Sequence, residues 1–504
     1  MSVSPLRGLG LFAPVLFVAQ AAHADLSAQD VWADWKDYLS NTGYTLTASE
    51  NQSGGTLTVS DIKMTMPVEE GTVNVSLGSI EFVENGDGTV NVLMPANMPM
   101  GFDVMADGEG IKGTLIYTHD GSPMIVSGDT AEMTYDYTSS AASFALDGIE
   151  IDGEPVPTEV LDFSVALTDI ASHTVMKIAD LRSYEQKMTT GALTYTATFN
   201  DPEGEGNGTF NGAVQGLDFA GTMVIPTVED PTDVAALLQS GMDYDATFKM
   251  GSGTSSMNFV DGSDSFASES AFQSASADLK MGAGGVALSV SQNDTSMSVM
   301  GSEIPFPIAL EMAEFGLNFA MPLVKSEGEQ DFALGLALRE FSVPEMLWGL
   351  IDPTGELPHD PATLVVDLSG KGLLDVDLVN EEEMAKVEMG EMVPGELRGL
   401  TLNELLLSVA GAELTGSGDF TFDNTDLESF DGMPAPEGEA NLKLVGANNL
   451  IDKLVGMGLL SDDDAMGARM MMGMFAVSAG DDVVTSKIEV NDEGHVLANG
   501  QRLK

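Results

Sequence analysis

The sequence predicts a mainly β protein of the α+β class, an elongated, curved antiparallel sheet in two halves with a few short helices. Apolar and polar residues alternate with a period of two along most of the chain, as in half-buried strands. The alternating runs are rich in Thr, Val, Tyr and Phe, and Gly, Asn and Asp separate them, which is typical of consecutive hairpins. Runs with helical spacing are few and short, so helices are expected to cover little of the sheet.

Residues 1–24 have the pattern of a secretory signal peptide. Arg7 precedes an apolar run that ends at Ala19, and Ala22-His23-Ala24 resembles a small-residue cleavage site before Asp25. The apolar run is shorter than the ~20 residues of a membrane-spanning helix. We therefore expect cleavage between Ala24 and Asp25, a mature chain without a stable transmembrane segment, and a periplasmic location.

One amphipathic helix is expected directly after the cleavage point, in LSAQDVWADWKDYLSNTGY. Ser27 is placed to cap this helix and Gly43 to end it. Its apolar stripe at helical spacing consists of Val31, Trp32, Trp35 and Leu39.

The strands that follow change phase near Ser60-Asp61. Leu57 and Val59 share one phase, whereas Ile62, Met64 and Met66 alternate in the opposite one. A bulge or bend between them is therefore expected, and the sheet should be twisted and irregular.

The chain is expected to divide near Pro226 to Pro231. Residues 25–230 would form an N-terminal β-rich half that opens with the amphipathic helix, and residues 231–504 a C-terminal β-rich half with short helices. A helix, a Gly and a strand follow one another in DVWADWKDYLSNTGYTLT and again in DVAALLQSGMDYDATF, although the match is too loose for a repeat architecture. Further helices are predicted in PTDVAALLQSGM, VPEMLWGLI, NNLIDKLVGMGLL and DDAMGARMMMGMFAV.

The charge of the chain excludes nucleic acid as a partner. There are 79 Asp and Glu against 20 Lys and Arg, a formal net charge of -59. Binding a phosphate backbone relies on Lys and Arg that displace counterions, so this charge repels nucleic acid. Cysteine is absent, which leaves neither disulfides nor thiolate ligands.

Motifs for catalysis or metal binding are not found. G-x-S-x-G does not occur, and SDIK, from Ser60 to Lys63, lies in an alternating strand without the companion motifs of S-x-x-K enzymes. SDDDAMG and ENGDGTV lack EF-hand spacing, and we interpret them as a helix cap at Ser461 and a hairpin turn at Gly86-Asp87-Gly88. The histidines expected after cleavage are scattered at His119, His173, His359 and His495. We expect no enzyme, no metal and no cofactor.

The segment LWGLIDPTGELPHDPATLVVDLSG gathers titratable residues most densely. Trp348, Asp352, Glu356, His359 and Asp360 lie close together in it. A carboxylate beside a histidine can poise a general base, but no nucleophile or metal set accompanies this pair. The prolines favour a turn-rich connection between a helix and a strand, with Trp348 and Leu350 packed and the titratable side chains in solvent.

Methionine is abundant, with 31 in the chain, and several cluster in one predicted helix. Thioethers could hold Cu(I), methionines at helical spacing could pack in a core, or they could line an adaptable groove for acyl chains. The candidates for a hydrophobic groove or core are Met466, Met470, Met471 and Met474.

Three segments together resemble domain-of-unknown-function family 2125, uncharacterised exported proteins of alphaproteobacteria. They are DVWADWKDYLSNTGYTLTASE, the segment from Leu347 to Gly370, and the tail that begins at NNLIDKLVGMGLL. The resemblance covers most of the mature chain and implies a Gram-negative periplasm, but no activity. A looser likeness to large envelope proteins, whose curved sheets conduct lipid on their inner face, is an analogy of fold alone.

These observations predict a non-enzymatic periplasmic protein that binds a hydrophobic or lipid ligand or supports cell-envelope assembly. An alternating sheet has one apolar face that needs cover, and the few helices would leave part of it open. The alternative is a purely structural or protein-interaction module without a ligand. The sequence predicts no oligomeric state.

Overall fold

The computed structural model describes residues 25–68, 71–106, 109–179, 181–202, 204, 206–228 and 233–504. The predicted signal peptide (1–24) and the predicted division between residues 230 and 231 lie outside the described residues. Strands make up 63% of the structure and helices 13%, in one large antiparallel sheet, so the prediction of a mainly β fold is confirmed. None of the described helices is long and apolar enough to cross a membrane.

The helices of the described chain are α1 (Ala28–Asn41), α2 (Val234–Gln239), α3 (Glu345–Ile351), α4 (Glu381–Glu388), α5 (Ala447–Gly456) and α6 (Asp462–Phe475). All except α4 coincide with a predicted helix. The helix α4 was not predicted, because its apolar residues at helical spacing are only Met384 and Val387. Its start is marked by a cap, in which the Asn380 side chain accepts a hydrogen bond from the Glu383 N–H at 3.0 Å.

The strands before α2 run in a series of hairpins. They are β1 (Thr45–Ser53), β2 (Thr56–Val68), β3 (Gly71–Leu77), β4 (Ile80–Glu84), β5 (Val90–Leu93), β6 (Asn97–Ala106), β7 (Glu109–His119), β8 (Met124–Asp129), β9 (Glu132–Ile151), β10 (Glu154–Val156), β11 (Leu161–Ile178), β12 (Arg182–Asn200) and β13 (Asn207–Ile225). The turn between β4 and β5 contains Gly86 and Gly88, so the predicted hairpin there is confirmed.

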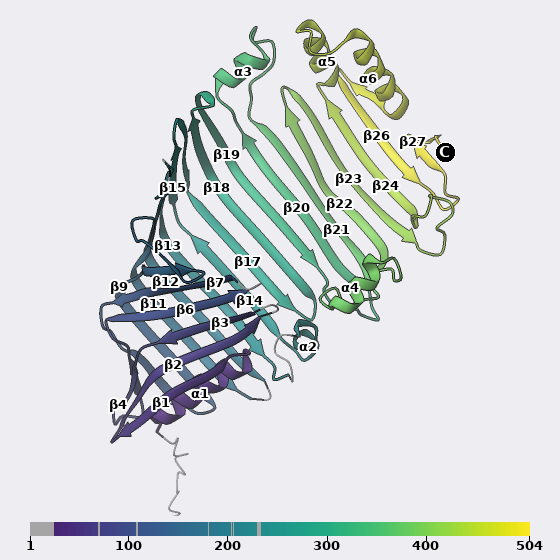
Figure 1. The fold of residues 1–504 in the computed structure, drawn as a ribbon. Helices are drawn as coiled ribbons and strands as arrows, with labels where there is room; N and C mark the ends of the chain where they lie inside the picture. The colour runs from purple at the N-terminus through teal and green to yellow at the C-terminus, as the bar shows by residue number, and fades with distance from the viewer. Residues whose placement is uncertain are drawn as a thin grey trace, which may run out of the picture.

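The strands after α2 continue the same sheet, because β13 pairs directly with β14 and β15. They are β14 (Asp243–Met250), β15 (Gly253–Asp261), β16 (Asp264–Phe272), β17 (Ser274–Gly282), β18 (Gly285–Gly301), β19 (Ile304–Met321), β20 (Gln330–Phe341), β21 (Ala362–Leu374), β22 (Gly395–Val409), β23 (Ala412–Asp423), β24 (Ala435–Val445), β25 (Val477–Gly480), β26 (Val483–Val490), β27 (Val496–Ala498) and β28 (Gln501–Arg502). The predicted halves are thus parts of one sheet, which Figure 1 shows as long and curved.

The sheet branches twice. At the first branch, one edge of β2 pairs with β3 along one part of its length and with β4 along another. From β3 the pairing continues through β6 and β7 to one half of β9. From β4 it continues through β5 and β8 to the other half of β9. In the same way β13 pairs with β14 and β15, and these series meet again on β18 through β17 and β16. From β18 to β24 the strands form a simple meander.

Between the branches the long strands bend. Asp61, Asp169 and Asp294 interrupt β2, β11 and β18 with left-handed backbone conformations, at φ 52°, 50° and 49°, a conformation that Asp tolerates better than most residues. The bend predicted near Ser60-Asp61 is therefore confirmed. We name the strand parts paired with β4, β5, β8, β14 and β17 the α1 wall, and the parts paired with β3, β6, β7, β15 and β16 the second wall.

The main core lies between α1 and the α1 wall. Ser27 caps α1 in a capping box with Asp30, and Val31 and Trp32 are buried, as the apolar stripe predicted. The rings of Trp32 and Trp35 pack on Phe82 with centroids 5.8 and 5.3 Å apart. This cluster of buried residues also includes Leu57, Val59, Ile62, Val92, Val126, Met133 and Met176.

The later helices occupy strand ends instead of a face. Figure 1 shows α3 between β20 and β21 at one end of the sheet, α4 between β21 and β22 at the other, and α5 and α6 after β24. The expectation that helices close the ends of the sheet is therefore met by α3 to α6, and packing on a face by α1. No described helix covers the middle of strands β17 to β24.

Candidate functional site

The candidate site is the inner face of the sheet, which we define as the face on which α1 packs. Residues paired across neighbouring strands share a face, so the register follows this face outward from the core. From buried Met133 the partners run through Met176, Tyr184, Met223, Tyr244, Met281, Val286 and Met321. The face that is core at α1 is therefore the same face in β17, β18 and β19.

The inner face continues to the last long strand. Leu288 lies two residues after Val286 and so on the same face, and its line of partners runs through Phe319, Leu334, Leu368, Leu402, Gly418, Ala440 and Ile488. Charged residues of these strands, such as Asp331, Asp367 and Lys371, lie at the alternate positions on the outer face. The sheet is thus amphipathic from β17 to β26.

Large apolar side chains fill the inner face of these strands, and we name them the apolar band. Its members are Leu279, Met281, Val286, Leu288, Val290, Phe315, Leu317, Phe319, Leu334, Leu336, Leu338, Leu364, Val366, Leu368, Leu400, Leu402, Leu405, Leu407, Leu414, Phe420, Leu442, Leu444, Val484 and Ile488. Leu334 is 50% exposed and Leu407 39%, and none of the others is fully buried. Because no second layer covers it, the band is open to solvent.

Beside α1 the inner face forms a cavity of about 510 Å³. Trp32, Trp35 and Tyr38 of α1 form one side of it, and Phe219 and Tyr244 of the sheet lie at the edge that leads to the apolar band. Its lining also includes Ile62 and Met64, which follow the bend in β2, and Leu77 of β3. The cavity volume is within the ~300–1,000 Å³ that is usual for small-molecule sites.

A buried ion pair joins α1 to the sheet next to the cavity. The Arg182 guanidinium contacts the Asp34 carboxylate, and the Tyr135 hydroxyl donates a hydrogen bond to the same carboxylate at 2.5 Å. Burial raises the pKa of Tyr135 and of Tyr184, so both phenols are neutral at neutral pH. Each charge in this network has a partner, and the network fixes the position of α1 over the inner face.

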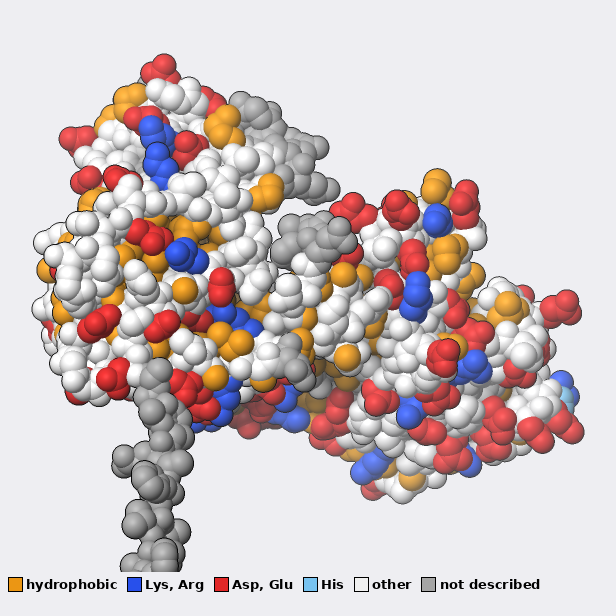
Figure 2. Space-filling model, turned by 90° about the horizontal axis from the view of Figure 1, so that it is seen from below, with side chains coloured by type: hydrophobic (Ala, Val, Ile, Leu, Met, Phe, Trp, Pro, Cys, Tyr) orange, Lys and Arg blue, Asp and Glu red, His pale blue; other side chains and the backbone are white. Residues whose placement is uncertain are grey.

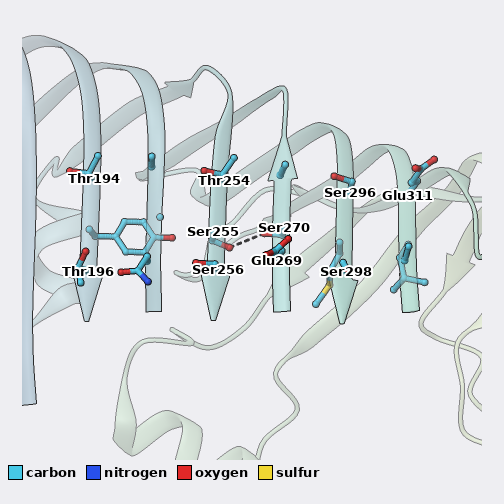
Figure 3. A pocket seen from close by; sticks show the side chains of 18 residues that line it. Thr194, Thr196, Thr254, Ser255, Ser256, Glu269, Ser270, Ser296, Ser298 and Glu311 are labelled. Carbon is cyan, nitrogen blue, oxygen red and sulfur yellow. Dashed lines mark hydrogen bonds between the residues drawn. The ribbon is translucent and has the colours of Figure 1, made fainter. Parts of the chain in front are cut away.

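The second wall carries a hollow of about 590 Å³ with a different lining (Figure 3). Small hydroxyl side chains dominate it, and Ser255 and Ser270 point toward each other with their oxygens 2.8 Å apart. Glu269 and Glu311 are its acidic residues. Its lining offers hydrogen-bonding groups but no histidine, lysine or arginine that could act as a base or bind an anion.

The predicted methionine candidates are brought together on α6, at the end of the sheet. Met466, Met470, Met471 and Met474 are between 50% and 69% exposed. They therefore form no part of a buried core, and the core interpretation of this stripe is wrong because α6 lies at the end of the sheet with only Ala465 buried. The Ser461 cap is confirmed, since its side chain accepts a hydrogen bond from the Asp464 N–H.

The segment after α3 is a packed turn, and the expectation that its titratable residues lie in solvent is wrong for Asp352 and for His359, whose side chain is 20% exposed. The Asp352 carboxylate is 2% exposed and accepts hydrogen bonds from the N–H groups of Leu357 at 2.6 Å and Glu356 at 3.0 Å. Burial alone would raise the pKa of Asp352, but these bonds and the contact with His359 outweigh it and lower the pKa to about 2. Glu356 is exposed as predicted.

His359 supports the same turn. Its ring stacks on Trp348 at 4.4 Å, and its Nδ1 lies 2.9 Å from a Glu345 oxygen. The prediction that Leu350 packs is wrong, because this side chain is 70% exposed on α3. The contacts of His359 are an indole ring and carboxylates, which is an arrangement that fixes a loop.

The surface of the molecule is acidic, as the composition indicates. Figure 2 shows acidic side chains spread over the face seen from below, with hydrophobic side chains between them. Within the described residues no group of three or more His, Cys, Asp or Glu side chains could hold a metal ion. The His173 ring contacts the Asp136 carboxylate, and the His495 ring contacts the Glu493 carboxylate.

No family model matches the chain, and no curated protein and no solved structure matches it either. The resemblance to domain-of-unknown-function family 2125 stays a prediction. The functional interpretation therefore depends on the geometry of the inner face. The sequence did not predict which residues make up the inner face. They come from many strands, and only the folded sheet defines the register of those strands.

Proposed function

We propose that this protein binds hydrocarbon chains of a lipid, or of a similar hydrophobic envelope component, along the inner face of its sheet. It does so in the periplasm and without catalysing a reaction. The observation that carries the proposal is the apolar band, which continues the core face of the α1 wall through β26 while leucines such as Leu334 remain half exposed. Apolar patches of this extent mark interaction surfaces or ligand grooves.

The side chains of the band favour hydrocarbon over a protein surface. Protein interfaces are enriched in aromatic residues, Met and Arg and carry about one hydrogen bond per 100–200 Å². The band consists of Leu, Val, Phe, Met and Ile, which offer dispersion contacts and no hydrogen bonds. A flexible acyl chain needs only such contacts, so it fits this surface better than a folded partner does.

The apolar band is long enough to hold a whole acyl chain. The line of partners from Leu288 to Ile488 crosses β18 to β24 and then β26. With adjacent strands about 4.8 Å apart, this line spans roughly 34 Å. Two opposed acyl chains fill the ~30 Å hydrocarbon core of a bilayer, so one extended chain would occupy about half of the band.

The test is native mass spectrometry with lipid analysis of the protein purified from its own periplasm. We expect bound lipid in the unmodified protein, a strong loss in Leu334→Glu, and no loss in Ala333→Glu. These two positions are neighbours in β20 on opposite faces, so each variant adds the same charge and only the first places it against hydrocarbon.

Two results would count against the proposal. The first is unmodified protein that carries no lipid, and the second is equal lipid loss in both variants. If a protein partner co-purified instead and Leu334→Glu released it, the alternative of a protein-interaction module without a ligand would replace lipid binding.

A further inference from the structure

The two ends of the inner face differ in whether α1 covers them, and the cavity lies at the covered end. There the face passes beneath α1, and Trp35 and Tyr38 roof a space that Tyr184 and Phe219 line from below. From β20 to β24 no described helix covers the same face. A chain that lies along the apolar band toward α1 would therefore enter a covered end.

The lining of the cavity suits the end of an acyl chain and disfavours an anionic head group. Asp34 and Arg182 are buried and paired with each other, so the guanidinium is already neutralised. The other polar lining groups include the neutral phenols of Tyr38 and Tyr184 and the amide of Gln186. A phosphate or carboxylate placed here would lose its water without gaining a free cation, which is costly.

The cavity is continuous with the apolar band. Tyr244 at its edge pairs with Met281, which pairs with Val286, and both methionine and valine belong to the band. The register thus connects the roofed space to the open face without a charged residue between them.

We propose that this cavity is the end site of the groove, in which the terminal methyl end of an acyl chain lies under α1 while the head group stays toward the open part. The inference rests on the proposed function and adds the orientation of the ligand. Its consequence is that a chain enters tail first and that α1 sets how far it goes.

The chain contains its own reporters for this orientation. Of its three tryptophans, Trp32 and Trp35 line the cavity and Trp348 stacks on His359 in the turn after α3. In the variant Trp348→Phe, all tryptophan emission therefore comes from the cavity. Bromine quenches indole emission only near contact, so a brominated acyl chain reports which of its ends reaches α1.

The experiment loads full-length mature Trp348→Phe protein from vesicles of two phosphatidylcholines, one brominated near the terminal methyl and one near the glycerol ester. After the vesicles are removed, native mass spectrometry measures bound lipid and fluorescence measures quenching. We expect loss of emission with the methyl-end probe and none with the ester-end probe. Thr174→Phe, which fills the cavity, should abolish this loss, whereas Thr189→Phe on the outer face of β12 should not.

The outcomes separate the two proposals. Bound lipid with equal quenching by both probes, with stronger quenching by the ester-end probe, or with none would overturn the end site and leave the groove standing. Quenching that persists in Thr174→Phe would also overturn it. Protein that takes up neither probe by mass would remove the lipid-binding function, and the end site with it.

Discussion

The α1 end of the sheet and its later strands follow the same alternation but bury their apolar residues very differently. Leu57 in β2 and Leu334 in β20 both lie on the inner face, yet the first is 1% exposed and the second 50%. The difference is α1, which forms a second layer only over the first strands. Alternation determines which residues share a face, and a second layer determines whether that face becomes a core.

The largest expected effect comes from separating α1 from the sheet. Asp34→Ala leaves the Arg182 guanidinium buried without its partner, and breaking a buried pair in this way costs about 3–5 kcal/mol. Urea unfolding followed by tryptophan emission measures the change. The double variant Asp34→Ala/Arg182→Met should recover much of the loss, while Glu185→Ala, which breaks an exposed pair with Lys187, should cost no more than about 1 kcal/mol. Equal losses in all three variants would refute the role of the buried pair.

The next prediction compares the two leucines directly. Leu57→Ala should lower the free energy of unfolding by about 2–5 kcal/mol because it opens a cavity in the core. Leu334→Ala should lower it by about 1 kcal/mol, since half of this side chain is already in water and full burial of Leu contributes about 1.5–3 kcal/mol. If both variants lost the same free energy in ligand-free protein, the later strands would have a covering layer too.

A smaller and local effect is expected at the turn after α3. The pKa of Asp352 is lowered to about 2, below the ~3.9 of an unperturbed Asp. Its contribution to stability is therefore present above about pH 4 and is lost as the pH falls toward 2. Emission from Trp348 in a variant without Trp32 and Trp35 would follow this change, and Asp352→Asn should remove the pH dependence. If the Trp348 emission of Asp352→Asn changed with pH as in the parent variant, Asp352 would not be the group that stabilises the turn.

The smallest effect is expected on α6. Met470→Gln should change the free energy of unfolding by no more than about 0.5 kcal/mol, because the side chain is 66% exposed. Thermal unfolding measures this, with Ala465→Gln on the buried side of the same helix as the control that should destabilise it. A large loss in Met470→Gln would show that α6 packs more tightly than its exposure indicates.

Local features were predictable from the sequence because their causes are local. The helix with its Ser27 cap, the bend near Asp61 and the Gly86 turn each follow from a few neighbouring residues. The helix α4 was not predicted because only two apolar residues, Met384 and Val387, stand at helical spacing among its four Glu and one Lys. The packing predicted for Leu350 and the solvation predicted for Asp352 were wrong because both depend on where a turn lies against the rest of the chain.

The sequence by itself determined the mainly β class, the short helices and the amphipathic character of the strands, because alternation, caps and turn residues act over a few positions. Only the tertiary structure decided which strands share the inner face, that α1 covers one end of it, and that the later helices lie at strand ends. These features depend on pairings between strands, such as Leu334 with Leu368. They also depend on contacts between residues far apart in the sequence, such as Asp34 with Arg182. Such pairings have no local signature, because the register of each strand is set by its neighbours.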